Sequence, residues 1–152
     1  MQVNKTIEFC FAHREAILRI VTETKRDPGR GKTGGTAGTA KRSDPTCIKA
    51  MRNLEEVSCV EVPYGAFLNG KQDIFTLHDP ERWVKATDMT LAYFRGKLQA
   101  KLIVARYKEG RSREDICTEL CISRTTYHVL QNDVFCFATG VAAGLGILPP
   151  RR

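Results

Sequence analysis

Two helix-start signals lie close together in residues 112–131, SREDICTELCISRTTYHVLQ, and they constrain the fold more than any other part of the chain. Ser112 followed by Asp115 is a capping box, which opens a short helix. Ser123 is suited to cap a second helix that begins directly after it. Cys121 lies between the two helices, at a tight turn. The pattern predicts a helix-turn-helix over residues 112–131, within an all-α fold.

The apolar residues of this segment have the spacing that two crossed, packed helices require. Cys117 is small enough to let the helices approach closely. Cys121 stands where glycine is usual, so cysteine at this left-handed turn is a departure from the usual pattern. The residues expected to form the small core are Ile116, Leu120, Ile122, Tyr127 and Leu130.

The polar residues at the start of the second helix are the candidate binding residues. Arginine can read guanine in the major groove of double-stranded DNA, glutamine or asparagine can read adenine, and threonine can contact a thymine methyl or a phosphate. The free backbone N–H groups at this helix start form an anion site. The expected DNA-binding residues are Ser123, Arg124, Thr125, Thr126, His128, Gln131 and Asn132, joined by Arg111, Arg113 and Lys32. The alternative is a helical pair that only packs against a protein partner.

The remainder of the chain divides into three parts. Residues 1–25 have helical spacing and predict an N-terminal helix. Residues 26–43, RDPGRGKTGGTAGTAKRS, contain five glycines and no apolar period, which predicts a flexible basic linker. Lys32 in this linker either touches DNA phosphates or stays solvated, and the sequence leaves both open. Residues 44–152 are expected to form a helical domain that includes the helix-turn-helix.

The first half of this domain combines a helix with a small β insert. Asp44 and Pro45 suit a helix start, and helical spacing continues to about Cys59. Residues 60–77 then contain short apolar runs around Asn69-Gly70, a dipeptide typical of two-residue turns. We therefore expect a small β-hairpin in this insert.

A long helical pattern follows, from Pro80 to Ala105. Gly96 is expected to bend or break it, and Gly110 to close it as a left-handed cap. The basic residues near its end are either a solvated face or a flank that contacts phosphates.

The last apolar stretch, VFCFATGVAAGLGIL, has fifteen residues, which is too short to span a bilayer. Its apolar residues fall on several sides of a helix. We expect burial against the central helix or against a second subunit, and a dimer is the favoured oligomer because two half-sites multiply DNA affinity.

The net charge and the composition limit the classes of function that we expect for the chain. The formal net charge is +7, which favours a polyanion as partner. Charged residues interrupt the first 21 residues where a signal peptide would be apolar, so a cytoplasmic location is expected. The six cysteines contain no C-x-x-C pair, and no base, nucleophile or metal-ligand set is visible. We therefore expect no enzyme, no metal and no cofactor.

Three stretches suggest a family: SDPT at 43–46, LQAKLIVARY at 98–107 and EDICTELCISRTTYHVLQNDVFCFATGVAAGLGI at 114–147. Together they resemble the ArpU/RinA-like phage transcriptional regulators, which look like region 4 of sigma-70 factors. The resemblance covers about 43–148 and is specific over 98–147. It implies a phage or prophage regulator of late or packaging genes in a bacterial host cell, with Arg124, Thr125 and His128 at the DNA.

The function expected from the sequence is therefore sequence-specific DNA binding in transcription regulation. One alternative is a phage small terminase subunit, which recognises DNA for packaging and assembles into a ring. Another is an interaction module that docks on RNA polymerase without binding DNA.

Overall fold

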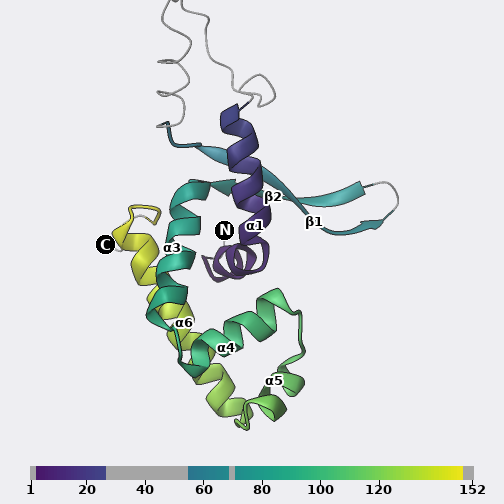
Figure 1. The fold of residues 1–152 in the computed structure, drawn as a ribbon, viewed down its shortest axis with the longest axis vertical. Coiled ribbons are helices and arrows are strands. Elements are labelled where there is room, and N and C mark those ends of the chain that lie inside the picture. Colours follow the sequence, from purple (N-terminus) through teal and green to yellow (C-terminus); the bar gives the residue numbers. More distant parts are fainter. Residues whose placement is uncertain (1–2, 27–54, 69–70, 149–152) are drawn as a thin grey trace, which may run out of the picture. The chain divides into compact units, whose positions relative to one another are not determined.

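The computed structural model describes residues 3–26, 55–68 and 71–148. Over these residues the chain is mostly helical, with a small two-stranded antiparallel hairpin, as predicted (Figure 1). Nearly all of the predicted linker 26–43, including Lys32, and the start of the helix expected at Asp44 lie outside the described residues.

The chain folds as two compact units, Met1–Glu15 with Arg82–Arg152, and Ala16–Glu81. Helix α1 (Val3–Arg26) contributes to both units. Its helical geometry is interrupted at His13, where φ is −116° and ψ is 19°. A helix thus lies where the sequence predicts one, but it consists of two segments.

The unit Ala16–Glu81 contains the hairpin of β1 (Cys59–Leu68) and β2 (Lys71–His78). Val60 pairs with Leu77 in the antiparallel register, and Val62 pairs with Phe75. Val60, Val62 and Leu77 are buried, because alternate residues of a strand share one face. The hairpin confirms the predicted insert.

One boundary prediction in this unit is wrong. The helix expected to run to about Cys59 does not reach it, because residues 55–58 are not helical and Cys59 begins β1. The alternating, β-branched Val60 and Val62 gain a paired partner strand, which outweighs helical spacing in the preceding residues.

Helix α3 (Pro80–Tyr93) belongs to the larger unit from Arg82 onward. The same unit contains α4 (Leu98–Ile103), the π-helical segment η1 (Val104–Lys108), α5 (Arg113–Glu119) and α6 (Arg124–Gly144). Gly96 has φ of +79° and separates α3 from α4, which confirms the predicted break. Gly110, with φ of +67°, lies between η1 and α5.

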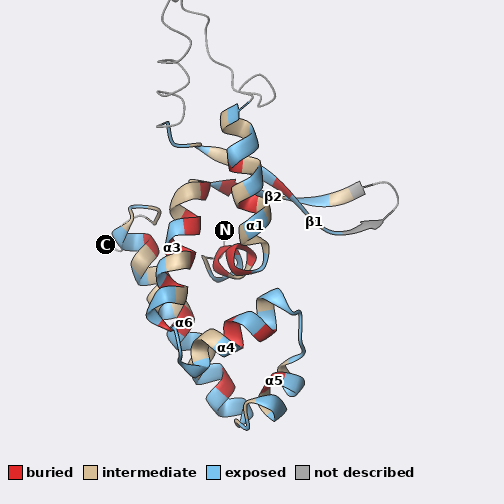
Figure 2. Ribbon diagram, in the orientation of Figure 1, coloured by how far each residue is buried: buried red, intermediate tan, exposed pale blue. Residues whose placement is uncertain are grey.

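The core of this unit follows one side of α6. Val134, Ala138 and Ala142 recur every four residues and are buried (Figure 2). Phe94, which directly follows α3, is buried, and its ring centroid lies 5.5 Å from that of Phe137 on α6. Near its N-terminal end, α6 contacts α4 and α5. This helix therefore extends from the core of the unit to residues 112–131, where the sequence predicts the helix-turn-helix.

Candidate nucleic-acid interface

Both predicted helix caps are present at the start of α5 and α6. The Ser112 hydroxyl accepts a hydrogen bond from the Asp115 backbone N–H at 3.2 Å and donates to the Asp115 carboxylate at 2.7 Å. The Ser123 hydroxyl accepts from the Thr126 backbone N–H at 3.0 Å. Each cap satisfies an N–H that has no partner inside its helix, and so fixes where the helix begins.

The connection between α5 and α6 is a tight turn at Cys121. This residue adopts φ of +52°, the left-handed conformation that glycine would adopt without strain. The backbone N–H of Ile122 donates to the Cys117 carbonyl at 2.9 Å, which closes the turn. The turn expected here forms despite the cysteine.

A small apolar core holds α5 and α6 together. Ile116 and Tyr127 are buried, and they pack with Leu102 of α4 and Ala105 of η1. The partly buried residues around them are Cys117, Leu120, Ile122 and Leu130. All five predicted core positions therefore contribute. Through Leu102 and Ala105, α4 and η1 also pack against this core.

The outer side of the first turns of α6 is polar and open to solvent. Arg124, Thr125, His128 and Asn132 are all exposed, and the Arg124 side chain retains 70% of its accessible surface. Ser123 and Thr126 are exposed as well, with their hydroxyls 2.9 Å apart in the cap. Apart from Gln131, the residues predicted on this helix thus lie at its surface.

Gln131 is placed differently from its neighbours. It is half-buried, and its side-chain nitrogen donates to the Tyr107 hydroxyl at 3.3 Å. The Tyr107 hydroxyl in turn donates to a Glu8 carboxylate oxygen at 3.3 Å. Burial raises the pKa of Tyr107, so the hydroxyl keeps its proton for this bond. Gln131 therefore joins α6 to η1 and α1 within the protein.

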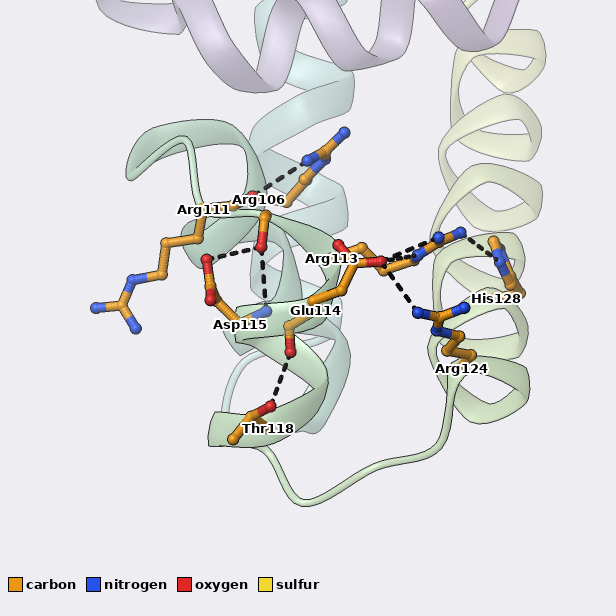
Figure 3. Close-up of polar contacts among 9 residues, drawn as sticks. Arg106, Arg111, Arg113, Glu114, Asp115, Thr118, Arg124 and His128 are labelled. Atoms are coloured by element: carbon orange, nitrogen blue, oxygen red, sulfur yellow. Dashed lines mark hydrogen bonds and ion pairs between the residues drawn. The ribbon is translucent and has the colours of Figure 1, made fainter.

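Two candidate residues approach Glu114, an acidic residue that the sequence did not single out, and a third, His128, contacts one of them. Arg113 donates to one Glu114 carboxylate oxygen from Nη2 at 3.1 Å, and the Nη2 atom of Arg124 lies 3.6 Å from the same oxygen. The Arg113 Nη1 atom lies 3.4 Å from His128 Nε2. Figure 3 shows these side chains directed toward one another from α5 and α6.

The electrostatics of this cluster favour an ionised Glu114. A hydrogen bond from its own backbone N–H lowers the pKa of Glu114, and the hydrogen bond from Arg113 lowers it further. Beside the cluster lies an open cleft of about 350 Å³, lined by Arg106, Arg113, Glu114, Tyr127, His128 and Gln131 among others. Cationic groups at a cleft beside a helix start can bind an anion.

Arg111 lies apart from this cluster. Its side chain is directed away from Arg113 and His128 (Figure 3). It forms ion pairs with Glu109, at 2.8 Å, and with Glu119. Two carboxylates thus pair with this arginine, whereas Arg113 and Arg124 share the single carboxylate of Glu114.

The sequence gives little indication that Glu114 belongs to the candidate site. Glu114 looks like an ordinary acidic residue in the first turn of a helix, and only the fold brings it beside Arg124. Among the residues that the structure describes, no cluster of His, Cys, Asp and Glu could hold a metal ion. In the same part of the chain, no helix has the length and apolar character needed to cross a membrane.

Comparison with known proteins gives no relative. No model of a known family, no curated protein and no solved structure matches the chain.

Proposed function

We propose that the chain is a sequence-specific DNA-binding transcription regulator, in which α5 and α6 form a helix-turn-helix. The observation that carries the proposal is the exposure of Arg124, Thr125 and His128 on the first turns of a helix held by a buried core. A rigidly held helix with polar residues at its start is suited to the major groove, because the core fixes its angle while the side chains remain free.

These residues would have different roles in DNA binding. Arg124, Thr125, His128 and Asn132 would contact base edges, which give sequence preference. Ser123, Thr126 and Arg113 would contact phosphates, which position the protein without reading sequence. Arg111 and Lys32 would add long-range attraction that salt weakens. Gln131 would not contact DNA, because its side-chain amide donates a hydrogen bond to the Tyr107 hydroxyl.

The resemblance to the ArpU/RinA-like regulators specifies the biological setting of the proposal. It rests on the motifs at 98–107 and 114–147, which include both the core and the exposed residues of α5 and α6. The corresponding role is regulation of late or packaging genes of a phage or prophage, inside a bacterial host cell.

Filter binding with one selected duplex and one random duplex tests the proposal. Arg124→Ala is expected to lose about 1–3 kcal/mol on the selected duplex and to keep its affinity for the random one. The fold should persist, because exposed ion pairs contribute little to stability. The control is Arg111→Ala, which removes an arginine directed away from Arg113 and His128 and is expected to weaken binding to both duplexes equally.

The linker is tested in the same assay. Lys32→Ala is expected to weaken binding to both duplexes slightly and by the same factor, since a phosphate contact carries no sequence information. If Arg124→Ala behaves in the same way as Lys32→Ala, α6 is not the reading helix. If no variant binds DNA with a salt-dependent affinity, docking on RNA polymerase becomes the better explanation.

A further inference from the structure

The cluster at Glu114 has the geometry of an occupied anion site. The two guanidinium groups of Arg113 and Arg124 approach the same carboxylate oxygen, at 3.1 and 3.6 Å. A guanidinium has only donors, so His128 Nε2 is the acceptor in its contact with Arg113 Nη1 at 3.4 Å. Arg113 therefore bridges the carboxylate and the imidazole, and holds both close to the start of α6.

We infer that Glu114 occupies a phosphate-binding subsite and competes there with the DNA backbone. Carboxylate and phosphate oxygens are bound by arginine in the same way, with short charge-assisted hydrogen bonds. When DNA binds, a phosphate oxygen takes the place of the Glu114 oxygen at Arg113, and Arg124 is released to contact a base edge. This inference rests on the proposed function and deepens it, by naming the ligand of Arg113 and the residue that limits the access of DNA to both arginines.

The position of Glu114 makes such an exchange feasible. Its side chain retains 55% of its accessible surface, so it can rotate into solvent without disturbing a core. Exposed ion pairs are weak, because water and salt screen them. The displaced carboxylate stays close to the DNA and repels it. Glu114 is therefore expected to weaken binding to every duplex by the same factor, since phosphates are the same in all sequences.

Glu119 provides a matched control on the same helix. It pairs with Arg111, which is directed away from the cluster, and its side chain is similarly exposed, at 51%. Glu114→Gln and Glu119→Gln change the net charge of the protein equally. A difference between them therefore reports the location of the charge and not its amount.

The first experiment measures the affinity of the full chain for selected and random duplexes. Glu114→Gln is expected to bind both about three- to tenfold more tightly at about 0.05 M salt, with a smaller gain at about 0.3 M. Glu119→Gln is expected to stay within about twofold of the wild type, because its charge lies farther from the duplex. Thermal unfolding of each variant verifies that the fold is intact.

If the wild type binds DNA and Glu114→Gln binds no more tightly than Glu119→Gln, the inference is overturned and the proposed function stands. Weaker binding by Glu114→Gln also overturns it, because Glu114 would then help to position the arginines.

A second experiment separates the two proposals if DNA does not bind at all. Inorganic phosphate is titrated into the wild type and into Glu114→Gln, while NMR follows the arginine Nε–H and histidine ring signals. We expect shifts at Arg113, Arg124 and His128 that are larger in Glu114→Gln than in the wild type. If phosphate shifts these signals no more in the variant than in the wild type, there is no subsite for Glu114 to occupy.

Discussion

At the scale of single residues, Cys121 carries the strain of the turn. Its φ of +52° brings the Cβ atom close to the following carbonyl oxygen, a conformation that costs most residues free energy. The residue is exposed, and its thiol makes a long contact of 3.7 Å with the Thr118 carbonyl oxygen. The turn therefore persists because the two caps and the core around Ile116 determine the path of the chain on both sides.

Cys121→Gly is expected to stabilise the protein. Glycine removes the Cβ strain but gains freedom in the unfolded chain, so the net increase in the free energy of unfolding should be about 0.5–1 kcal/mol. Cys121→Ala keeps the Cβ atom and should give no such gain. Urea unfolding of the three proteins measures the difference. Equal stability of the glycine and alanine variants would show that the turn is unstrained.

The cysteines differ in reactivity. Burial raises the pKa of Cys10 to about 12, whereas Cys121 and Cys136 are exposed. A raised pKa keeps a thiol protonated, and only the thiolate attacks thiol reagents. At about pH 8, thiol reagents should modify the exposed Cys121 and Cys136 quickly because they can reach them, and Cys10 only after unfolding. Peptide mapping by mass spectrometry distinguishes them. Rapid modification of Cys10 in the native protein would contradict its burial.

At the scale of elements, the cap of α6 contributes directly to stability. Ser123→Ala removes the hydroxyl that accepts from the Thr126 backbone N–H, and should lower the free energy of unfolding by about 1 kcal/mol. Thr125→Ala, at an exposed position of the same helix, should change it by less than about 0.5 kcal/mol. Chemical denaturation checks both. A Ser123→Ala protein as stable as Thr125→Ala would mean that the core alone fixes the start of α6.

Local signals explain which elements were predictable from the sequence. The caps at Ser112 and Ser123, the break at Gly96 and the hairpin all arise from residues within a few positions of one another. The five core positions of α5 and α6 were predictable for the same reason, because their spacing within each helix determines the buried face.

The features that the sequence did not reveal depend on tertiary contacts. From the sequence, Gln131 is a candidate to contact adenine, but in the structure its side chain donates a hydrogen bond to Tyr107 of η1. Tyr107 also donates to Glu8, which is 99 residues away in the chain. Glu114 contacts Arg124 only because the turn at Cys121 brings α5 and α6 together. The expected helix does not include residues 55–58, because that prediction omitted the pairing of β1 with β2.

At the scale of the whole molecule, the dimer expected from the sequence stays a prediction. Residues 134–144 of α6 carry no charge, and a groove of about 670 Å³ lies along this half of the helix. Its lining includes Tyr93, Phe94, Lys97, Asp133, Phe137 and Gly140. A second copy suits this groove, because a two-fold axis can pair Lys97 of one copy with Asp133 of the other.

Two glycines of α6 offer a matched test of the dimer. A Cβ atom at Gly140 or Gly144 would meet open space, but only Gly140 lines the groove. Gly140→Lys should therefore give a monomer, because the dimer would bury an unpaired charge, whereas Gly144→Lys should remain a dimer. Light scattering after gel filtration measures the mass. A monomeric wild type would contradict the predicted dimer, and a ring of many subunits would favour a small terminase.

Selection of bound sites from a pool of random duplexes tests the central claim most directly. If Arg124, Thr125 and His128 read base edges, the wild type should enrich one short sequence, and a palindrome would indicate two copies related by a two-fold axis. The Arg124→Ala protein should lose enrichment at one or more positions of that sequence. Retention of duplexes without any enriched sequence, or no retention at all, would contradict the claim that α6 reads DNA.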